Sequence, residues 1–218
     1  MIPILYQDRQ VVVCLKPAGV SSEADGLAAI LKKELNKETV YCVHRLDRDV
    51  GGVMVYALTK PAAASLSAAV AERRVEKEYL AVVPGVPEPP SGTLRDLLFH
   101  DKVRNKTYVV DRMRRGVKEA VLSYDMLARG YQSSLLRIRL HTGRSHQIRV
   151  QFASRRLPLL GDRKYGSTYS CPIALWAESL RFPHPVTGEL ISFSVLPARA
   201  FPWDSFTTLF QEDEHEIH

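Results

Sequence analysis

The amino-acid sequence predicts an α+β fold, in which helices flank a central sheet that is mixed and mainly antiparallel. Strand-like segments outnumber helical ones, they follow one another at hairpin-like spacing, and few classical βαβ units occur. With 218 residues, of which 45% are hydrophobic and 25% charged, the chain is long enough to bury the core of such a fold.

Seven segments are predicted to be strands, because each is a short apolar run or alternates apolar with polar residues. They lie at residues 11–15, 53–58, 77–83 and 118–127, within 133–145, and at 174–180 and 190–196. In the fifth of them, Leu136 and Ile138 alternate with Arg137 and Arg139. This alternation indicates one face in the core and one wet, basic face.

Three helices are predicted between these strands. Residues 25–35 carry leucines at helical spacing behind Asp25, a candidate N-cap, and residues 60–73 follow Thr59, a second candidate N-cap. A third helix is expected to begin at Ser145. The two residues before it would then lie at a helix N-terminus, where free backbone N–H groups favour an anion.

The sequence indicates a single domain over residues 1–210, followed by a polar tail at 211–218 that is expected to be frayed. Residues 84–92 contain four prolines and two glycines, which makes them the best candidate for a hinge between sub-lobes. No signal peptide or membrane span is evident, and three scattered cysteines argue against a disulfide framework or a thiolate zinc site. We therefore expect a cytoplasmic protein that does not associate with a membrane.

Positive charge is spread along several segments of the chain. The formal net charge is +6, and 30 residues are Lys or Arg. The basic runs are residues 72–78, 101–106, 111–118 and 153–156. Each run alone is typical of a solvated surface, whereas together they favour an anionic partner such as a nucleic-acid backbone.

The most unusual stretch is HRLDRD at residues 44–49, which places five ionisable groups in six positions. Asp47 follows Arg45 closely, and a neighbouring cation lowers the pKa of a carboxyl group, so that it stays ionised at neutral pH. An ionised, oriented carboxylate can be a covalent nucleophile, but the same residues can also form a structural ion pair. The next residues, Gly51 and Gly52, leave room for another backbone or a ligand to come close.

Standard motifs for nucleotide binding, acyl transfer and zinc hydrolysis are absent, since the chain has no GxGxxG, P-loop, GxSxG or HExxH. The pairs His44 with Asp47 and His141 with His146 match no standard metal-ligand spacing. Structural histidines are therefore favoured over a metal site.

Six motifs follow one another along the chain: KPAG at 16–19, HRLD at 44–47 with GGVMVYALTK behind it, EKEYLAVVPG at 76–85, HTGRSHQIRVQFA at 141–153, LLGDRKYG at 159–166 and ESLRFPHPVTGE at 178–189. The ordered set, from Val12 to about Val195, resembles the RluA-type family of RNA pseudouridine synthases. The resemblance implies a catalytic domain whose sheet has two halves beside a basic cleft. It also implies isomerisation of a uridine in RNA: the C1′–N1 bond breaks, the uracil rotates, and it is rejoined through C5, with no cofactor and no metal.

The resemblance assigns roles to three catalytic residues. Asp47 matches the catalytic aspartate, which attacks C1′ or C6 of the nucleotide or acts through a glycal intermediate. Tyr79 matches the tyrosine that stacks on the target base and serves proton chemistry at C5. Arg144 matches the arginine that pairs with the catalytic aspartate.

The resemblance also implies residues that bind RNA. Arg45 matches the arginine that enters the RNA stack where the uridine leaves, which offsets part of the cost of flipping the base. Ile148 matches an apolar residue of the pocket. The other residues expected in the RNA-binding segments are His44, Lys77, His146, Gln147 and Arg149. The two histidines are expected to act as a hydrogen-bonding scaffold without titrating.

The chain departs from the family pattern in several places. Arg48, Asp49 and Val50 replace the hydroxyl residues usual there, so the hydrogen bonds of this loop are expected to differ. Trp176 replaces a histidine and cannot accept a hydrogen bond. The catalytic motifs begin by residue 12, so no S4-type RNA-binding domain is expected, and the basic surface of the catalytic domain would supply RNA affinity.

Two other functions stay open. A catalytically inactive RNA-binding or ribosome-assembly relative would be expected to lose one of the three catalytic residues, yet all are present. A metal-dependent nuclease or phosphatase built on His44, Asp47, His141 and Asp162 would need these ligands clustered. For the synthase, the expected partner is a stem-loop of ribosomal or transfer RNA, and no obligate protein partner is evident.

Overall fold

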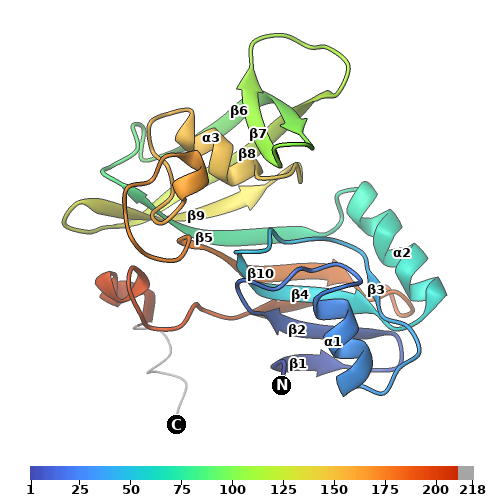
Figure 1. The fold of residues 1–218 in the computed structure, drawn as a ribbon. Helices are drawn as coiled ribbons and strands as arrows, with labels where there is room; N and C mark the ends of the chain where they lie inside the picture. The colour runs from blue at the N-terminus through green and yellow to red at the C-terminus, as the bar shows by residue number, and fades with distance from the viewer. Residues whose placement is uncertain (211–218) are drawn as a thin grey trace. The chain divides into compact units, whose positions relative to one another are not determined.

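The computed structural model describes residues 1–210 of the chain (Figure 1), and the predicted polar tail at 211–218 lies outside the described residues. The fold is α+β with parallel and antiparallel strand pairs, as the sequence predicts. Among the residues described, no helix has the length and apolar character needed to cross a membrane.

The chain divides into two compact units. Unit 1 comprises residues 1–78 and 176–195, and unit 2 comprises residues 79–175 and the chain from 196 on. The boundaries fall inside two strands, β5 (Glu76–Pro84) and β10 (Leu175–Pro183). The proline-rich segment predicted as a hinge lies within unit 2 and away from these boundaries, and a hinge motion there stays a prediction.

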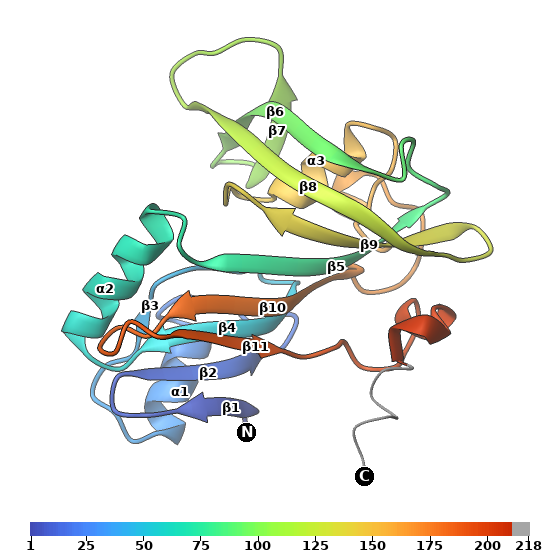
Figure 2. The same ribbon diagram turned by 180° about the vertical axis from the view of Figure 1, so that it is seen from behind.

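The sheet of unit 1 has the strand order β1, β2, β4, β10, with β11 paired to β10 and the short β3 paired to β4 (Figures 1 and 2). The other elements of this unit are β1 (Ile4–Gln7), β2 (Val11–Lys16), α1 (Leu27–Glu34), β3 (Tyr41–Cys42), β4 (Gly51–Ala57), α2 (Lys60–Ala71) and β11 (Leu190–Ser194). Strands β2 and β4 are antiparallel, whereas β4 and β10 are parallel at Gly51 and Gly52. The sheet of unit 1 is therefore mixed.

Both faces of this sheet are covered. One face packs against α2 in a core made of Val11, Val13, Val53, Val55, Ala57, Ala62, Leu66, Leu180 and Phe182. The residues between them, such as Cys14 and Tyr56, are fully buried on the opposite face, where α1 lies (Figures 1 and 2). Burial on both faces explains why β2 and β4 have nearly continuous apolar sequences.

The two helix caps predicted for unit 1 have different outcomes. The Thr59 hydroxyl accepts a hydrogen bond from the Ala62 N–H at 3.3 Å, which confirms it as the N-cap of α2. The prediction of Asp25 as a cap is wrong, because Gly26 takes the N-cap position of α1. A Cβ atom at Gly26 would lie 2.2 Å from the Ser21 carbonyl oxygen, so this tight turn needs glycine before the helix.

In unit 2 the strand order is β5, β9, β8, β6, β7, and the last four of these strands pair antiparallel, with β6 between β8 and β7. Its other elements are β6 (Ser91–Asp101), β7 (Lys106–Val110), β8 (Val117–Arg129), β9 (Ser133–Leu140) and α3 (Gln147–Ala153). Val150 of α3 packs against Leu98 and Ala120, and the rings of Phe152 and Tyr124 meet edge to face at 5.4 Å. Helix α3 thus covers one face of this antiparallel sheet.

Four strands, β1, β3, β6 and β7, were absent from the predicted set. The longest of these, β6, interrupts its apolar pattern with Arg95, Asp96, His100 and Asp101, so no period of two is visible. The predicted start of the third helix is wrong by two residues. The cause is His146, whose φ of 53° is left-handed, so α3 begins only after it.

Candidate active site

Asp47 lies on the loop that joins β3 to β4 in unit 1. Its side chain is half-exposed, and its carbonyl accepts a hydrogen bond from the Val50 N–H at 3.0 Å, which closes a turn just before β4. Every residue of β4 is buried. The carboxylate is therefore carried by a turn that leads directly into a fully buried strand, and it is half-buried itself.

A buried lysine ties the Asp47 loop to the KPAG loop. The side chain of Lys16 is 0% exposed, and its ammonium group donates to the carbonyls of Pro17 at 2.9 Å, Val20 at 2.7 Å and Arg48 at 2.9 Å. All three N–H donors of the ammonium group are thereby satisfied. Because Arg48 directly follows Asp47, this contact holds the backbone next to the candidate nucleophile.

Charges and further hydrogen bonds reinforce this lysine-centred contact. Burial lowers the pKa of Lys16 to about 8, and the nearby carboxylates of Asp49 and Asp47 oppose that shift. The Arg48 Nε donates to the Gly19 carbonyl at 2.8 Å, and the Arg48 carbonyl accepts from the Gly19 N–H at 2.8 Å. Arg48 thus ties the loop at one of the positions where hydroxyl residues would be usual.

The substitution Lys16→Met is expected to lower the free energy of unfolding by about 3 kcal/mol, because three carbonyls lose the charged donor that joins them. Urea unfolding of the wild type, this variant and Lys37→Met, which removes an exposed lysine, measures the effect. A loss no larger than that of Lys37→Met would show that the ammonium group does not hold the loop.

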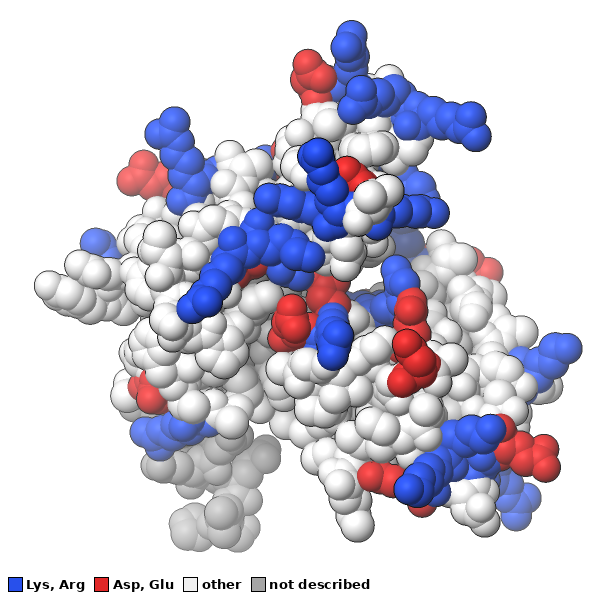
Figure 3. All heavy atoms as spheres, in the orientation of Figure 1, with Lys and Arg blue, Asp and Glu red and all other residues white. Residues whose placement is uncertain are grey.

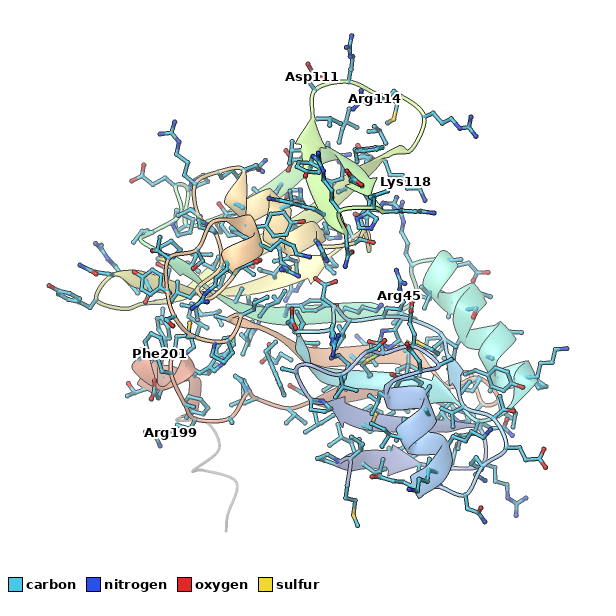
Figure 4. The ribbon with its side chains drawn as sticks, in the orientation of Figure 1. Arg45, Asp111, Arg114, Lys118, Arg199 and Phe201 are labelled. Carbon is cyan, nitrogen blue, oxygen red and sulfur yellow. The ribbon has the colours of Figure 1, made fainter. Side chains whose placement is uncertain are left out.

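A second set of contacts joins the Asp47 loop to the segment before α1. Ser22 Oγ donates to the Leu46 carbonyl at 3.0 Å and accepts from the Leu46 N–H at 3.1 Å, and both residues are buried. Beside them, the guanidinium of Arg45 forms an ion pair with the carboxylate of Glu23. The Arg45 side chain is 63% exposed and lies at the surface of unit 1 (Figure 4).

His44 is buried, and its Nε2 accepts a hydrogen bond from the Val55 N–H at 3.2 Å. Burial, and then the charge of Lys77, hold the pKa of His44 well below its usual range, so the ring is neutral and its proton is on Nδ1. Burial also lowers the pKa of Lys77 to about 8, against the influence of Cys42. This geometry supports a scaffold role for His44, while contacts of His44 and Lys77 with RNA stay a prediction.

The space beside Gly51 and Gly52 is filled by β10. A Cβ atom at Gly52, whose φ is +130°, would lie 2.3 Å from the Ala177 carbonyl oxygen. A Cβ atom at Gly51 would lie 2.5 Å from the ring of Trp176, whose Nε1 donates to the Val195 carbonyl at 2.7 Å. The two glycines therefore admit a neighbouring backbone and an indole ring, and Trp176 acts as a hydrogen-bond donor.

In unit 2, Arg144 lies on the loop between β9 and α3. Its Nε donates to the Glu119 carbonyl at 3.0 Å, and its backbone N–H donates to Gln147 Oε1 at 3.0 Å. The expectation of free N–H groups waiting for an anion is therefore wrong at Arg144. Gln147 also donates to the Val121 carbonyl at 3.1 Å and accepts from the Thr142 hydroxyl at 2.8 Å, which fixes the whole loop on β8.

Residues 146–150, which begin two positions after Arg144, are buried. Arg149 forms a two-pronged ion pair with Asp162, with N–O distances of 2.7 and 2.9 Å, and His146 Nδ1 is 2.9 Å from the Tyr165 hydroxyl. Ile148 is 4% exposed. These contacts support a positioning role for the segment, whereas direct contact of His146, Gln147, Ile148 and Arg149 with RNA stays a prediction.

The catalytic candidates are distributed over both units. Asp47 and Arg45 belong to unit 1, and Tyr79 and Arg144 belong to unit 2, where the Tyr79 side chain is 5% exposed. Within unit 1, hydrogen bonds hold the loop that carries Arg45 and Asp47, and within unit 2 they hold the loop that carries Arg144. The juxtaposition of the two sets stays a prediction.

The ligand set required by the metal-dependent alternative is not assembled. Within residues 1–210, no three His, Cys, Asp or Glu side chains are grouped so that they could hold a metal ion. His44 is buried against β4, and Asp162 is occupied by Arg149. A metal-dependent nuclease or phosphatase therefore receives no support from this donor set.

Two positioning residues were missed by reasoning from the sequence. Lys16 carried a usable signal, since a lysine at the end of an apolar strand and before Pro-Ala-Gly is a candidate buried cation. Ser22 carried none, because one serine in a polar segment has no distinguishing pattern.

Comparisons with known proteins show which family this chain resembles. The family described as RNA pseudouridylate synthase matches residues 10–154. The ribosomal large subunit pseudouridine synthase D of Xanthomonas campestris pv. campestris is 36% identical over 217 residues, which cover 88% of this chain and 64% of that protein. An uncharacterized RNA pseudouridine synthase of Aquifex aeolicus is 35% identical over 226 residues, which cover 92% of this chain and 71% of that protein.

A solved structure gives the same result. The human protein RNA pseudouridylate synthase domain containing 4 has a TM-score of 0.78 and 27% identity, over 95% of this chain and 93% of that one. The family match includes Asp47, Tyr79 and Arg144 and covers more than half of the chain. The chain therefore belongs to the RNA pseudouridylate synthase family.

Proposed function

We propose that this protein isomerises uridine to pseudouridine in a stem-loop of ribosomal or transfer RNA, with Asp47 as the nucleophile. The observation that carries the proposal is the HRLD loop, where a half-buried carboxylate precedes a fully buried strand on a backbone held by Lys16. An oriented carboxylate on a rigid element is what covalent catalysis requires. The family match supports the same activity.

The reaction needs no external redox partner, because its atoms balance within the nucleotide. The C1′–N1 bond breaks, a C1′–C5 bond forms, N1 gains a proton, and C5 loses its proton to solvent. Asp47 would hold the nucleotide covalently, at C1′ or at C6, while the uracil turns. A base that must leave its stack also needs partners outside the helix, and Arg45 and Tyr79 are the proposed ones.

Basic residues on the loop between β7 and β8 are the proposed RNA-binding surface of unit 2. The loop between β7 and β8 carries Arg112, Arg114 and Arg115, all exposed, and Arg114 lies 5.5 Å over the ring of Phe99. Figure 4 labels Arg114 and Lys118 at this loop, and Figure 3 shows Lys and Arg side chains gathered over the same part of unit 2. Such exposed cations attract phosphates and favour RNA of any sequence.

Replacing Arg112 and Arg115 by alanine is expected to weaken RNA binding and to reduce the slope of log K against log salt by about 1 to 2, because up to two phosphate contacts are lost. The matched control is Lys32→Ala with Lys33→Ala at the end of α1, which removes two cations from unit 1. Filter binding between 50 and 200 mM salt, concentrations that span the steep range of such contacts, gives both slopes. Equal changes in the two double variants would argue against a specific role for the β7–β8 loop.

The test of the proposed function uses RNA labelled with tritium at C5 of uridine. The purified protein should release tritium from total RNA of a strain that lacks the gene, and the release should persist with a chelator in a buffer whose potassium salt keeps the RNA folded. Loss of activity on chelation, restored by a divalent metal but not by more potassium salt, would contradict a metal-independent mechanism. No release from any RNA would contradict the proposed function itself.

A further inference from the structure

The ion pair between Glu23 and Arg45 engages the arginine side chain that is proposed to contact RNA. Arg45 is the exposed arginine of the HRLD loop, and its guanidinium is bound by the carboxylate of Glu23. The side chains are 63% and 54% exposed, so solvent and an incoming RNA can reach both of them. An arginine cannot hold this carboxylate and enter an RNA stack with the same N–H groups at the same time.

The pair is built into the fold by its neighbours. Glu23 lies between Ser22 and Ala24 in the sequence. The Ser22 hydroxyl forms hydrogen bonds with the backbone carbonyl and N–H of Leu46, which directly follows Arg45. These two hydrogen bonds fix the loops side by side at buried positions. The carboxylate of Glu23 therefore stays at a high local concentration beside Arg45, which makes the contact a persistent competitor for that side chain.

We propose that Glu23 is a specificity-determining residue that holds Arg45 in the free protein and must release it when RNA binds. The inference rests on the proposed function, since it concerns the arginine that would replace the flipped uridine. RNA that offers Arg45 a good stacking and phosphate environment displaces the carboxylate. RNA that binds only through its backbone does not recover the cost of breaking the pair, so Glu23 disfavours such sites.

The first test is a binding cycle with Glu23→Gln, which keeps the shape of the side chain and removes its charge. Exposed ion pairs of this kind correspond to about a 1.4- to 5-fold change in an equilibrium constant. The variant is expected to bind a substrate stem-loop more tightly by that factor in the wild-type background. In an Arg45→Met background the same substitution is expected to leave the dissociation constant unchanged.

The cycle separates release of Arg45 from a general gain of positive charge. Glu72→Gln is the matched control, because Glu72 forms a comparable exposed pair with Arg74 in unit 1. Equal tightening by Glu23→Gln with and without Arg45, or equal tightening by Glu72→Gln, would overturn the inference. Weaker binding of Glu23→Gln would also overturn it, since Glu23 would then prepare Arg45 for RNA.

The second test keeps this inference distinct from the proposed function. Tritium release by the wild type and by Glu23→Gln is compared on a substrate stem-loop and on the same stem-loop with altered flanking nucleotides. A smaller ratio between the two RNAs for Glu23→Gln is the expected result. An active wild type with an unchanged ratio in the variant would overturn the role of Glu23 alone, whereas an inactive wild type would overturn both proposals.

Discussion

Asp47→Asn is expected to lower the rate of uridine isomerisation by a factor on the order of 10⁴ or more, as for other covalent nucleophiles. Asparagine preserves the shape of the side chain but has no carboxylate to attack C1′ or C6. The backbone of the loop is held by Lys16 and by the turn to Val50, so the variant should fold normally. RNA binding is expected to persist, because removing a negative charge does not weaken an attraction to phosphates.

Single-turnover tritium release measures the effect of Asp47→Asn, and Asp49→Asn is its matched control. Asp49 lies two residues away on the same loop, is exposed, and acts on Lys16 in the same electrostatic sense as Asp47. Its replacement should leave most of the activity. Equal losses in the two variants would mean that the charge of the loop, and not a nucleophile at one position, supports catalysis.

Gly52→Ala is expected to lower the free energy of unfolding by about 3 to 5 kcal/mol, from backbone strain and overpacking together. Gly52 has a φ of +130°, which side chains rarely tolerate, and a Cβ atom there would lie 2.3 Å from the Ala177 carbonyl oxygen. Because that oxygen belongs to the backbone of β10, it cannot turn aside as a flexible side chain would. The parallel pairing of β4 with β10 would have to open.

The control for this substitution is Gly19→Ala. Gly19 has a φ of +85°, but no atom lies within 4 Å of its Cβ position, so only backbone strain of about 1 to 2 kcal/mol is expected there. Urea unfolding of both variants separates the free-energy cost of backbone strain from the cost of the steric clash with β10. Similar losses at Gly19 and Gly52 would show that β10 does not press against Gly52.

Reasoning from the sequence recovered the elements whose side chains repeat with a clear period. Strand β4 is apolar throughout, and α2 shows its cap residue and its buried Leu66 in the sequence itself. Strand β6 escaped because charged residues sit on a strand that faces solvent along much of its length. The start of α3 was misplaced because the left-handed conformation of His146 is uncommon outside glycine and cannot be inferred from one histidine in the sequence.

The candidate site was predictable to the extent that its chemistry depends on residue types in a short motif. Asp47 and Arg45 could be singled out because HRLD concentrates charge before an apolar strand. The contacts that orient them could not, since Lys16 and Ser22 reach Arg48 and Leu46 across more than 20 residues of sequence. The burial of Gln147 and Arg149 was hidden for the same reason, because polar residues are usually exposed unless a distant partner satisfies them.

The measurement that tests the central claim most directly is a pseudouridine map of total RNA. Strains that lack the gene are compared after complementation with the wild type or with Asp47→Asn, with equal expression of both proteins. We predict at least one uridine that is converted in the wild-type strain and left unmodified in the deletion and Asp47→Asn strains. Identical maps in the wild-type and Asp47→Asn strains would contradict the assignment of Asp47 as the nucleophile of an RNA pseudouridine synthase.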